Sequence, residues 1–206
     1  MNDNDTPTEA SAARPKRPPR GERKLQILQT LAEMLEEPGG ERVTTAALAG
    51  RLQVSEAALY RHFASKAQMF EGLIEFIEQS LFGLINQITS EQTQGTRQAA
   101  LILQMMLGFA ERNPGMTRVL TGDALVNEQD RLQERINQAM DRLEMSLKQC
   151  YRVAISQGLL PPSEDPAMRA DLAMGWVIGR WMRYAKSNFK RKPQEGSVGA
   201  VARLTS

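Results

Sequence analysis

Apolar residues recur at intervals of three and four along most of the chain, which is the spacing that lets a helix bury one face. The pattern begins between Ile27 and Leu35 and stops at the turn-forming residues 38–40. A longer seam runs from Leu132 to Ala154 and ends before Gly158. The sequence shows none of the strict apolar–polar alternation that is typical of strands. It therefore predicts an all-α fold.

Three helix starts follow one another closely between residues 44 and 66. Thr44, Ser55 and Ser65 are each suited to cap a helix, because a short hydroxyl side chain accepts a hydrogen bond from a free backbone N–H. We expect two short helices over 45–52 and 56–63, joined by a turn, and a long helix from residue 66 to about residue 88.

The C-terminal half predicts further helices with clear boundaries. One runs from about residue 96 to Asn113, which caps a short helix that has Pro114 at its first position. The last clear helix runs from about residue 165 to residue 190. We expect four regions: a disordered basic arm over 1–22, a helix-turn-helix domain over 23–70, a helical regulatory and dimerisation domain over 71–192, and a weakly ordered tail over 193–206.

Composition narrows the class of protein. The 206 residues are 41% hydrophobic, which is enough for a core, yet they contain no apolar run long enough to span a membrane. The N-terminus lacks the apolar stretch of a signal peptide, and the single cysteine, Cys150, cannot form an internal disulfide. These features predict a cytoplasmic protein.

Charge is nearly balanced over the whole chain but concentrated near its start. The formal net charge of +2 is too small to indicate nucleic acid by itself. Between Arg14 and Lys24, however, six basic residues accompany one acid. Such a cluster is either a solubilising tail or an arm that neutralises phosphates. In the second case Arg17 and Arg20 are the candidate phosphate contacts.

The two short helices and their turn have the layout of a helix-turn-helix, whose second helix enters the major groove of double-stranded DNA. At about 100° per residue, Leu59 and Phe63 share a buried face. Ala57 and Arg61 lie on the opposite face, and Tyr60 flanks them. The small side chains near the helix start permit close approach to base edges. This face therefore predicts DNA binding.

His62 is the only histidine in the chain, and it is open to three interpretations. A catalytic or metal site needs further suitable side chains, and the chain offers only one distant cysteine. A structural histidine or a phosphate contact fits better. The sequence also lacks the phosphate-binding, zinc-protease and nucleophile-elbow motifs of common enzymes. We expect no enzyme activity, no metal and no cofactor.

Residues 43–70 carry a specific resemblance. The stretch VTTAALAGRLQVSEAALYRHFASKAQMF is similar to the N-terminal domain of the TetR family of transcription regulators. Gln53 and Ala64 depart from that pattern, in which glycine is frequent at the first position and proline or glycine at the second. The resemblance implies DNA contacts by residues on and around the two short helices, namely Thr44, Thr45, Ser55, Glu56, Ala57, Ala58, Tyr60, Arg61, His62 and Lys66.

Four later segments are similar to the nucleoid occlusion factors of bacteria, a group within that family. They are GLIEFIEQSL at 72–81, LGFAERNPGMTRVLTGDAL at 107–125, EQDRLQERINQ at 128–138 and KSNFKRKP at 186–193. The resemblance implies a dimer, associated with the nucleoid, that binds palindromic chromosomal sites. It also implies binding to the division protein FtsZ, so that the division ring does not close over DNA.

The implied FtsZ-binding positions are Phe76, Gly108, Arg112 and Asn113, whereas Leu84 stands where that group is expected to have an arginine. Plainer interpretations remain: Phe76 as core, Asn113 as a helix cap and Gly108 as a helix crossing. The alternative function is a TetR-type repressor that a small ligand releases from its operator. Polar residues inside the predicted core over 96–190 are few, which disfavours this alternative.

The last helix carries the prediction of a homodimer. Gly175 and Gly179 lie one turn apart among apolar residues, which allows helices to pack closely. Together with the 132–154 seam, this pattern predicts two helices per subunit in a four-helix interface. A purely intramolecular core is the alternative. The predicted interface residues are Leu143, Leu147, Gly175, Ile178, Gly179 and Met182.

Overall fold

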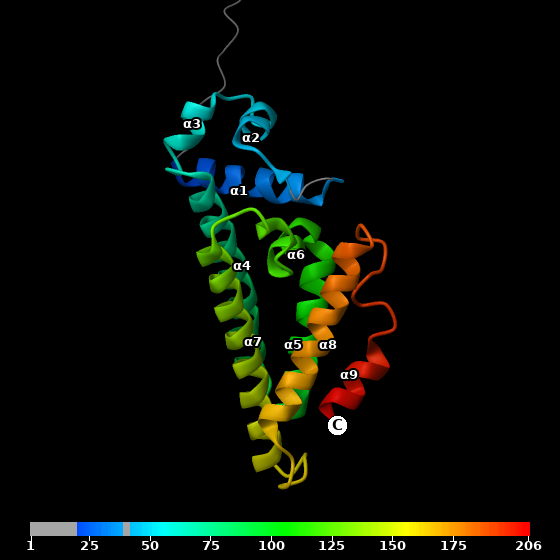
Figure 1. Cartoon of the computed structure of the whole chain (residues 1–206). Helices are drawn as coiled ribbons and strands as arrows, with labels where there is room; N and C mark the ends of the chain where they lie inside the picture. The colour runs from blue at the N-terminus through cyan, green and yellow to red at the C-terminus, as the bar shows by residue number, and fades with distance from the viewer. Residues whose placement is uncertain (1–19, 39–41) are drawn as a thin grey trace, which may run out of the picture.

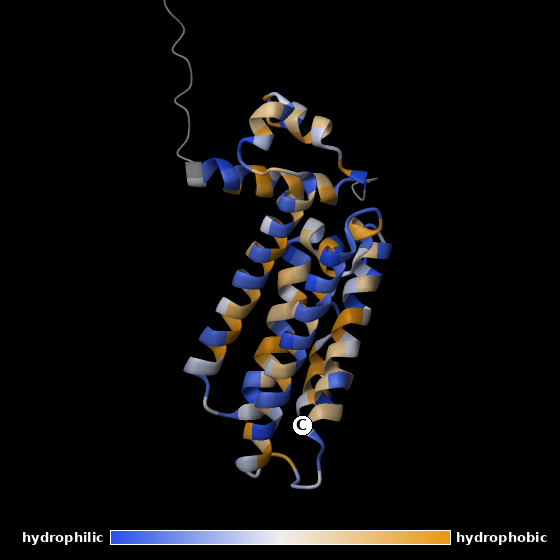
Figure 2. Cartoon of the chain, turned by 60° about the vertical axis from the view of Figure 1, so that its left-hand side comes forward, coloured by the Kyte–Doolittle hydropathy of each residue, from blue (hydrophilic) through white to orange (hydrophobic). Residues whose placement is uncertain are grey.

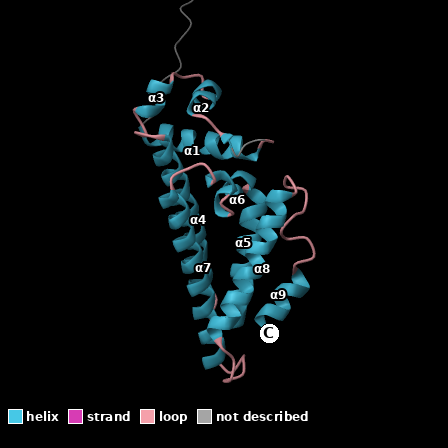
Figure 3. Ribbon diagram, viewed as in Figure 1, coloured by secondary structure: helices cyan, strands magenta, loops and turns pink. Residues whose placement is uncertain are grey.

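The computed structural model describes residues 20–38 and 42–206, and this part of the chain contains helices and loops but no strand (Figure 3). The prediction of an all-α fold is confirmed. Arg17 and the rest of the predicted arm up to residue 19 lie outside the described residues, as does the side chain of Arg20.

Apart from α9, which was not predicted, the helices follow the predicted order along the chain. Their bounds are Arg20–Glu36 (α1), Thr45–Arg51 (α2), Glu56–Tyr60 (α3), Lys66–Glu91 (α4), Gly95–Arg112 (α5), Pro114–Leu120 (α6), Asp130–Ser156 (α7), Pro166–Lys186 (α8) and Val198–Thr205 (α9). A 3-10 turn over Asp123–Leu125 separates α6 from α7.

Two helices end earlier than predicted because side chains leave the helix to pack. In α3 the regular helix stops at Tyr60, and the chain then turns so that Phe63 enters the core. In α8 the helix stops at Lys186, because Asn188 and Phe189 adopt positive φ angles of 49° and 61°. Those angles place the Phe189 ring 5.1 Å from the ring centroid of Tyr184.

The chain forms a small upper group of helices, α1 to α3, above a longer bundle (Figure 1). The helix α4 begins beside α3 and runs down into the bundle along α7. Within the bundle α7 packs against α5 and α8. Figure 2 shows polar and apolar residues alternating around most helices, as expected for helices that turn one face inward.

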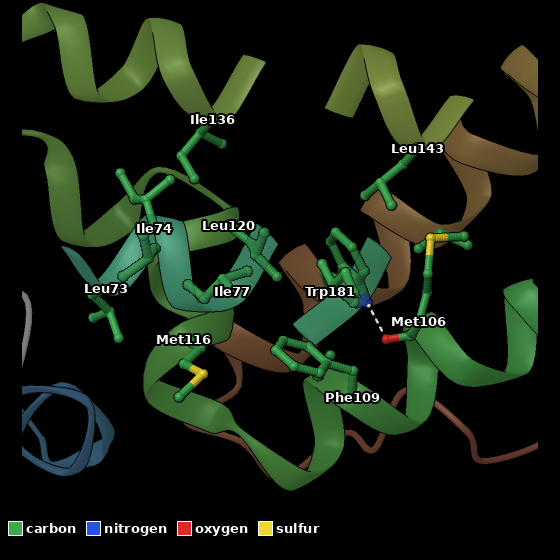
Figure 4. Packing of buried hydrophobic residues seen from close by; sticks show 14 of the residues in the cluster. Leu73, Ile74, Ile77, Met106, Phe109, Met116, Leu120, Ile136, Leu143 and Trp181 are labelled. Carbon is green, nitrogen blue, oxygen red and sulfur yellow. Dashed lines mark hydrogen bonds between the residues drawn. The ribbon is translucent and has the colours of Figure 1, made fainter. Parts of the chain in front are cut away.

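The bundle core is apolar, and its largest side chain is the indole of Trp181, which carries one N–H donor. Trp181 of α8 is fully buried, and its Nε1–H donates to the carbonyl of Met106 on α5 at 3.2 Å (Figure 4). Leu143 of α7 and Ile77 of α4 lie beside this centre, and Ile136 of α7 lies farther along the core, next to Ile74 of α4. Burial of such side chains contributes about 1.5–3 kcal/mol each. The core therefore joins α4, α5, α7 and α8 into one unit.

The upper group is fixed to the bundle through α1 and α6. Gly115 of α6 lies so close to α1 that an added Cβ would sit 1.9 Å from the carbonyl oxygen of Ala32. Arg118 of α6 is 5% exposed, and its Nη1 donates to the carbonyl of Glu37 at 3.1 Å. The same guanidinium lies 4.9 Å from the ring centroid of Phe189. These contacts join the end of α1, α6 and the segment after α8.

The residues expected to be weakly ordered, 193–206, include the helix α9, so this expectation is wrong. Val201 and Thr205 of α9 are buried, and α9 packs on α5. The hydroxyl of Tyr151 donates to the carbonyl of Leu204 at 3.0 Å. The spacing from Val198 through Val201 to Leu204 was a helical signal too short to stand out. None of the described helices is both long and apolar enough to cross a membrane.

Candidate nucleic-acid interface

Each helix of the helix-turn-helix begins at a capped end, as predicted. The Thr44 hydroxyl accepts a hydrogen bond from the backbone N–H of Ala47 at 3.2 Å, and the Ser55 hydroxyl accepts one from Ala58 at 3.3 Å. The Ser65 hydroxyl, at the start of α4, accepts one from Gln68 at 3.2 Å. Such caps contribute about 1 kcal/mol each. They matter most for α2 and α3, which are too short to be stable alone.

The turn between α2 and α3 depends on Gln53. Its φ of 54° lies in the left-handed region, which costs a non-glycine residue about 1–2 kcal/mol. Two backbone bonds offset this cost: the N–H of Gln53 donates to Gly50 at 3.1 Å, and the N–H of Val54 donates to Ala49 at 3.0 Å. The turn therefore fixes the angle between the two helices even without the glycine that is frequent at this position.

The orientation predicted for α3 is confirmed. Leu59 and Phe63 are 1% and 8% exposed and belong to the core. Ala57, Tyr60 and Arg61 are exposed. The exposed side chains of α3 and of the residue after it are thus those of Glu56, Ala57, Tyr60 and Arg61, with the half-buried Ala58 beside them. This outward surface has the size and the donors that a helix needs to approach base edges.

Three polar side chains link α2 to α3 on this outward surface. The Thr45 hydroxyl donates to Oε2 of Glu56 at 2.7 Å. The Tyr60 hydroxyl approaches Oγ1 of Thr45 at 3.5 Å, a long contact in which Tyr60 is the donor. The network holds the first and last residues of α3 against the first residue of α2.

Lys66, one of the residues implied to contact DNA, forms its contacts with the bundle. Its Nζ lies 2.5 Å from Oε1 of Glu128, in the loop before α7, and 5.7 Å from the ring centroid of Phe70. The Lys66 side chain is 34% exposed, whereas the Glu128 side chain is only 12% exposed. A phosphate contact would therefore share this ammonium group with Glu128. Glu128 was not predicted as the partner of Lys66, because a pair 62 residues apart leaves no local signal in the sequence.

His62 lies half-buried just after α3, and its backbone N–H donates to the carbonyl of Leu59 at 2.9 Å. Over residues 20–38 and 42–206, no three His, Cys, Asp or Glu side chains are grouped as a metal site requires. Cys150 is buried on α7, and burial raises the pKa of its thiol to about 11. The raised pKa keeps the Cys150 thiol protonated near neutral pH, whereas a nucleophile or a metal ligand needs the thiolate.

The positions implied for FtsZ binding lie on α4 and at the end of α5. Arg112 is exposed, and an added Cβ on the buried Gly108 would sit 3.1 Å from Nη1 of Arg112 and 3.2 Å from Nε2 of Gln194. Phe76 is half-buried on α4, against the core. α4 and α5 pack together, so these positions belong to neighbouring helices.

Asn113 does not cap α6 with its side chain, which corrects the prediction. It stands at the N-cap position, but its Nδ2 donates backward to the carbonyl of Phe109 at 2.7 Å. The side chain thus closes the C-terminal end of α5. The hydroxyl of Thr117 instead donates to the carbonyls of Ala110 and Asn113, both at 3.0 Å, and stabilises the corner between the two helices.

Two of the predicted dimer residues are placed differently by the structure. Leu143 and Leu147 are 0% exposed within a single chain, so they cannot meet a partner and this part of the prediction is wrong. Figure 4 shows Leu143 turned toward Trp181 and Met106 of the same chain. The α7 seam packs on α4, α5 and α8 instead.

The other predicted dimer residues share an outward face of α8. Gly175 and Gly179 are exposed, and an added Cβ on either would meet nothing within 4 Å. Ile178 is 36% exposed and Met182 is half-buried. Met168 and Leu172 extend the face toward the start of α8, at 54% and 58% exposure. We call these six residues the α8 face.

A groove between α4 and α7 bears on the alternative of a ligand-controlled repressor. It encloses about 860 Å³ together with open solvent, and Ile85, Thr89, Gln98, Met145 and Cys150 are among its lining residues. The amide of Gln98 is used internally, since its Nε2 donates to the carbonyl of Gln92 at 2.6 Å. The groove is open along one side, unlike the enclosing pocket that a small-molecule effector needs.

Comparisons with known proteins agree with both halves of the chain. The family model for bacterial regulatory proteins of the TetR family matches residues 27–73. The SlmA-like model, described as a tetracyclin repressor-like C-terminal domain, matches residues 93–198.

Curated relatives extend the similarity over most of the chain. The nucleoid occlusion factor SlmA of Marinomonas sp. (strain MWYL1) is 51% identical over 176 residues, which is 85% of this chain and 89% of that protein. The protein of the same name from Alteromonas mediterranea is 52% identical and covers 84% of this chain and 89% of its own length. The one from Aliivibrio fischeri (strain ES114) is 48% identical, with shares of 89% and 92%.

Solved structures with the same fold are more distant in sequence. The fatty acid degradation regulator FadR from Bacillus halodurans matches with a TM-score of 0.73 at 16% identity, over 92% of this chain and 96% of that chain. FadR from Bacillus subtilis, in complex with stearoyl-CoA, matches with a TM-score of 0.72 at 15% identity, over 88% and 97%. At these identities the likeness concerns the fold alone.

Proposed function

We infer the function of this chain from its family: it belongs to the SlmA nucleoid occlusion factors, within the TetR family of bacterial regulatory proteins. We propose that it binds palindromic sites on the chromosome and inhibits assembly of the FtsZ division ring there. The observation that carries this proposal is identity of about half, extending over both the helix-turn-helix and the bundle. The activity is binding, at the nucleoid, rather than catalysis.

The proposed DNA contact is the outward surface of α2 and α3. Tyr60 and Arg61 supply donors on the exposed side, while Thr44 and Ser55 lie at helix starts where backbone N–H groups meet phosphates. Arg17 and Arg20 belong to the proposed basic arm, whose contacts with phosphate would be independent of sequence.

A dimer is proposed because a palindrome is read by two symmetric units. The α8 face offers an apolar strip in which two glycines leave room for a second helix. A palindrome requires the two α3 helices of such a dimer to enter successive major grooves, about 34 Å apart. The buried α7 seam supports α8 from behind rather than meeting the partner.

FtsZ is the proposed protein partner, through Phe76, Gly108, Arg112 and Asn113. The exposed guanidinium of Arg112 suits a carboxylate, because it presents paired donors, and FtsZ is expected to have an acidic C-terminal tail. Gly108 is buried beneath the side chains of Arg112 and Gln194, and its lack of a side chain lets them lie close to α5. Because α4 connects α3 to the bundle, DNA and FtsZ binding would influence each other equally in both directions.

The experiment measures binding of a labelled FtsZ tail peptide by fluorescence anisotropy, with and without a palindromic duplex. Arg112→Ala should weaken binding at least about tenfold, the loss expected for a charged hydrogen bond, and should leave DNA affinity unchanged. Arg97→Ala removes an exposed arginine at the other end of α5 and serves as the control. Equal peptide affinity of the Arg112 variant and the wild type would refute the site.

A genome-wide binding map distinguishes nucleoid occlusion from the repressor alternative. Dozens of scattered palindromic sites are expected for a nucleoid occlusion factor, and Arg61→Ala should weaken binding at all of them by removing a base contact worth about 1–3 kcal/mol. A single site beside the gene of this chain would contradict the proposal.

A further inference from the structure

The surface proposed to face DNA contains one acid, Glu56. Between residues 42 and 70 it is the only acidic side chain, among the basic residues Arg42, Arg51, Arg61 and Lys66. It is exposed at the first position of α3. A carboxylate on a surface that binds a polyanion lowers affinity for phosphate, so its presence there calls for a compensating role.

Glu56 is the final acceptor of a short chain of hydrogen bonds that runs from Tyr60 through Thr45. Thr45 has a single hydroxyl proton, and it is donated to Oε2 of Glu56 at 2.7 Å. Oγ1 of Thr45 can then only accept, which matches the approach of the Tyr60 hydroxyl at 3.5 Å. Oε1 of Glu56 accepts no hydrogen bond from any residue in the described part of the chain. Glu56 is thus oriented and left with an open acceptor.

An ionised carboxylate can only accept, so its ligand must be a donor. Phosphate and sugar oxygens of DNA offer no N–H in the major groove, whereas the base edges offer two: the amino group N4 of cytosine and N6 of adenine. Ala57 and Ala58, which follow Glu56, have small side chains that allow the start of α3 to approach these edges.

We propose that Glu56 determines DNA specificity by accepting a hydrogen bond from an exocyclic amino group, cytosine N4 or adenine N6, with Thr45 as its positioning residue. The inference rests on the proposed DNA-binding function. Glu56 would lower affinity for all DNA slightly through repulsion of phosphates, and raise discrimination at one base pair in each half-site. The competing explanation is that the Thr45–Glu56 bond only ties α2 to α3.

The experiment compares palindromic duplexes in which one amino group per half-site is deleted. Purine replaces adenine, or 2-pyrimidinone replaces cytosine, at each position in turn, and affinity is measured at one fixed salt concentration. One replacement should weaken wild-type binding on the order of tenfold, the value of one hydrogen bond to a charged group. The same replacement should leave Glu56→Ala unaffected, because the variant has no acceptor to lose. Whether the effective analogue is purine or 2-pyrimidinone identifies the base.

Two further variants distinguish recognition of a base by Glu56 from a purely structural link between α2 and α3. Thr45→Val keeps the shape of Thr45 but cannot donate, so it should weaken discrimination at the same base pair as Glu56→Ala. Glu56→Ala should also bind a scrambled duplex more tightly than the wild type. Glu91→Ala, which removes an exposed acid at the far end of α4, should leave both quantities unchanged.

The possible results distinguish failure of the proposed role of Glu56 from failure of the proposed DNA-binding function. If the wild type prefers the palindrome but every analogue affects wild type and Glu56→Ala alike, the reading role of Glu56 is overturned. A fall in thermal stability of Glu56→Ala with unchanged discrimination would assign the bond to tethering alone and would also overturn it. A wild type that binds palindromic and scrambled duplexes equally would refute sequence-specific DNA binding itself.

Discussion

Gly115 is the position where the two halves of the molecule are most sensitive to one added carbon. It lies in α6 against α1, and a Cβ there would be 1.9 Å from the carbonyl oxygen of Ala32 and 3.1 Å from Cβ of Leu35. Contacts below 3.0 Å are essentially never found for real Cβ atoms, and the nearer atom belongs to the backbone. Gly115→Ala must therefore separate α1 from α6 by about 1 Å or more.

The cost has two sources in the structure. Forcing a methyl group into a packed contact costs about 1–3 kcal/mol. The same separation lengthens the bond from Nη1 of the buried Arg118 to the carbonyl of Glu37, now 3.1 Å, and losing a bond from a charged group costs about 1.5–3 kcal/mol. We expect a total of about 3–5 kcal/mol. For a chain of this size, the melting temperature should fall by roughly 10 °C.

The assay is thermal unfolding followed by circular dichroism, at one protein concentration, because a dimer melts at a temperature that depends on concentration. Gly83→Ala is the matched control. Gly83 is an exposed residue inside α4 with nothing within 4 Å of an added Cβ, so alanine should stabilise the helix by about 1 kcal/mol. A Gly115→Ala protein that melts at or above the wild-type temperature would refute the close contact between α1 and α6.

Three further predictions concern other parts of the molecule. Gly179→Leu should abolish the dimer in light scattering while leaving the monomer folded, whereas Gly83→Leu should not; a dimeric Gly179 variant would rule out the α8 face. Burial raises the pKa of Cys150 to about 11 and that of Tyr151 to about 12, so both groups stay protonated in the folded chain at pH values where the unfolded chain ionises. The contribution of these two groups to the free energy of unfolding, measured in urea, should hence be constant between neutral pH and about pH 8 and fall as the pH rises toward 12, and a rise over that range would contradict the burial of these groups. Removal of residues 1–19 should weaken binding to all duplexes alike and flatten its salt dependence, and an unchanged slope would make the arm a mere tail.

Helix starts were predictable because their signals are local. A hydroxyl at Thr44, Ser55 or Ser65 meets a backbone N–H only three residues away, so the sequence alone contains both partners. The ends of α3 and α8 were predicted too late, because there the chain leaves the helix to pack an aromatic ring on distant residues. Phe63 and Phe189 look the same in sequence whether they continue a helix or end it.

The α7 seam shows a second limit of periodicity. A regular apolar stripe predicts that one face of a helix is buried, but not whether the covering surface belongs to the same chain or to a partner. Leu143 and Leu147 were assigned to a dimer on this pattern, yet one chain buries them completely. The α8 face stays a prediction: Met168, Leu172 and Ile178 are exposed in a single chain, as residues that a partner covers would be.

The contacts that join the two halves are the part that sequence could not supply. Arg118 bonds to a carbonyl 81 residues away and to Oδ1 of Asn188, 70 residues away, and no spacing rule relates such positions. α1 serves both sides at once: Ile27 and Leu31 belong to the core beneath the helix-turn-helix, while Ala32 touches Gly115 of α6. Because α1 and α6 are in close-packed contact, α6 cannot move toward α1 without displacing it. Since α2 packs on α1 and α3 packs on α2, a displacement of α6 would be passed to the two helices proposed to meet DNA.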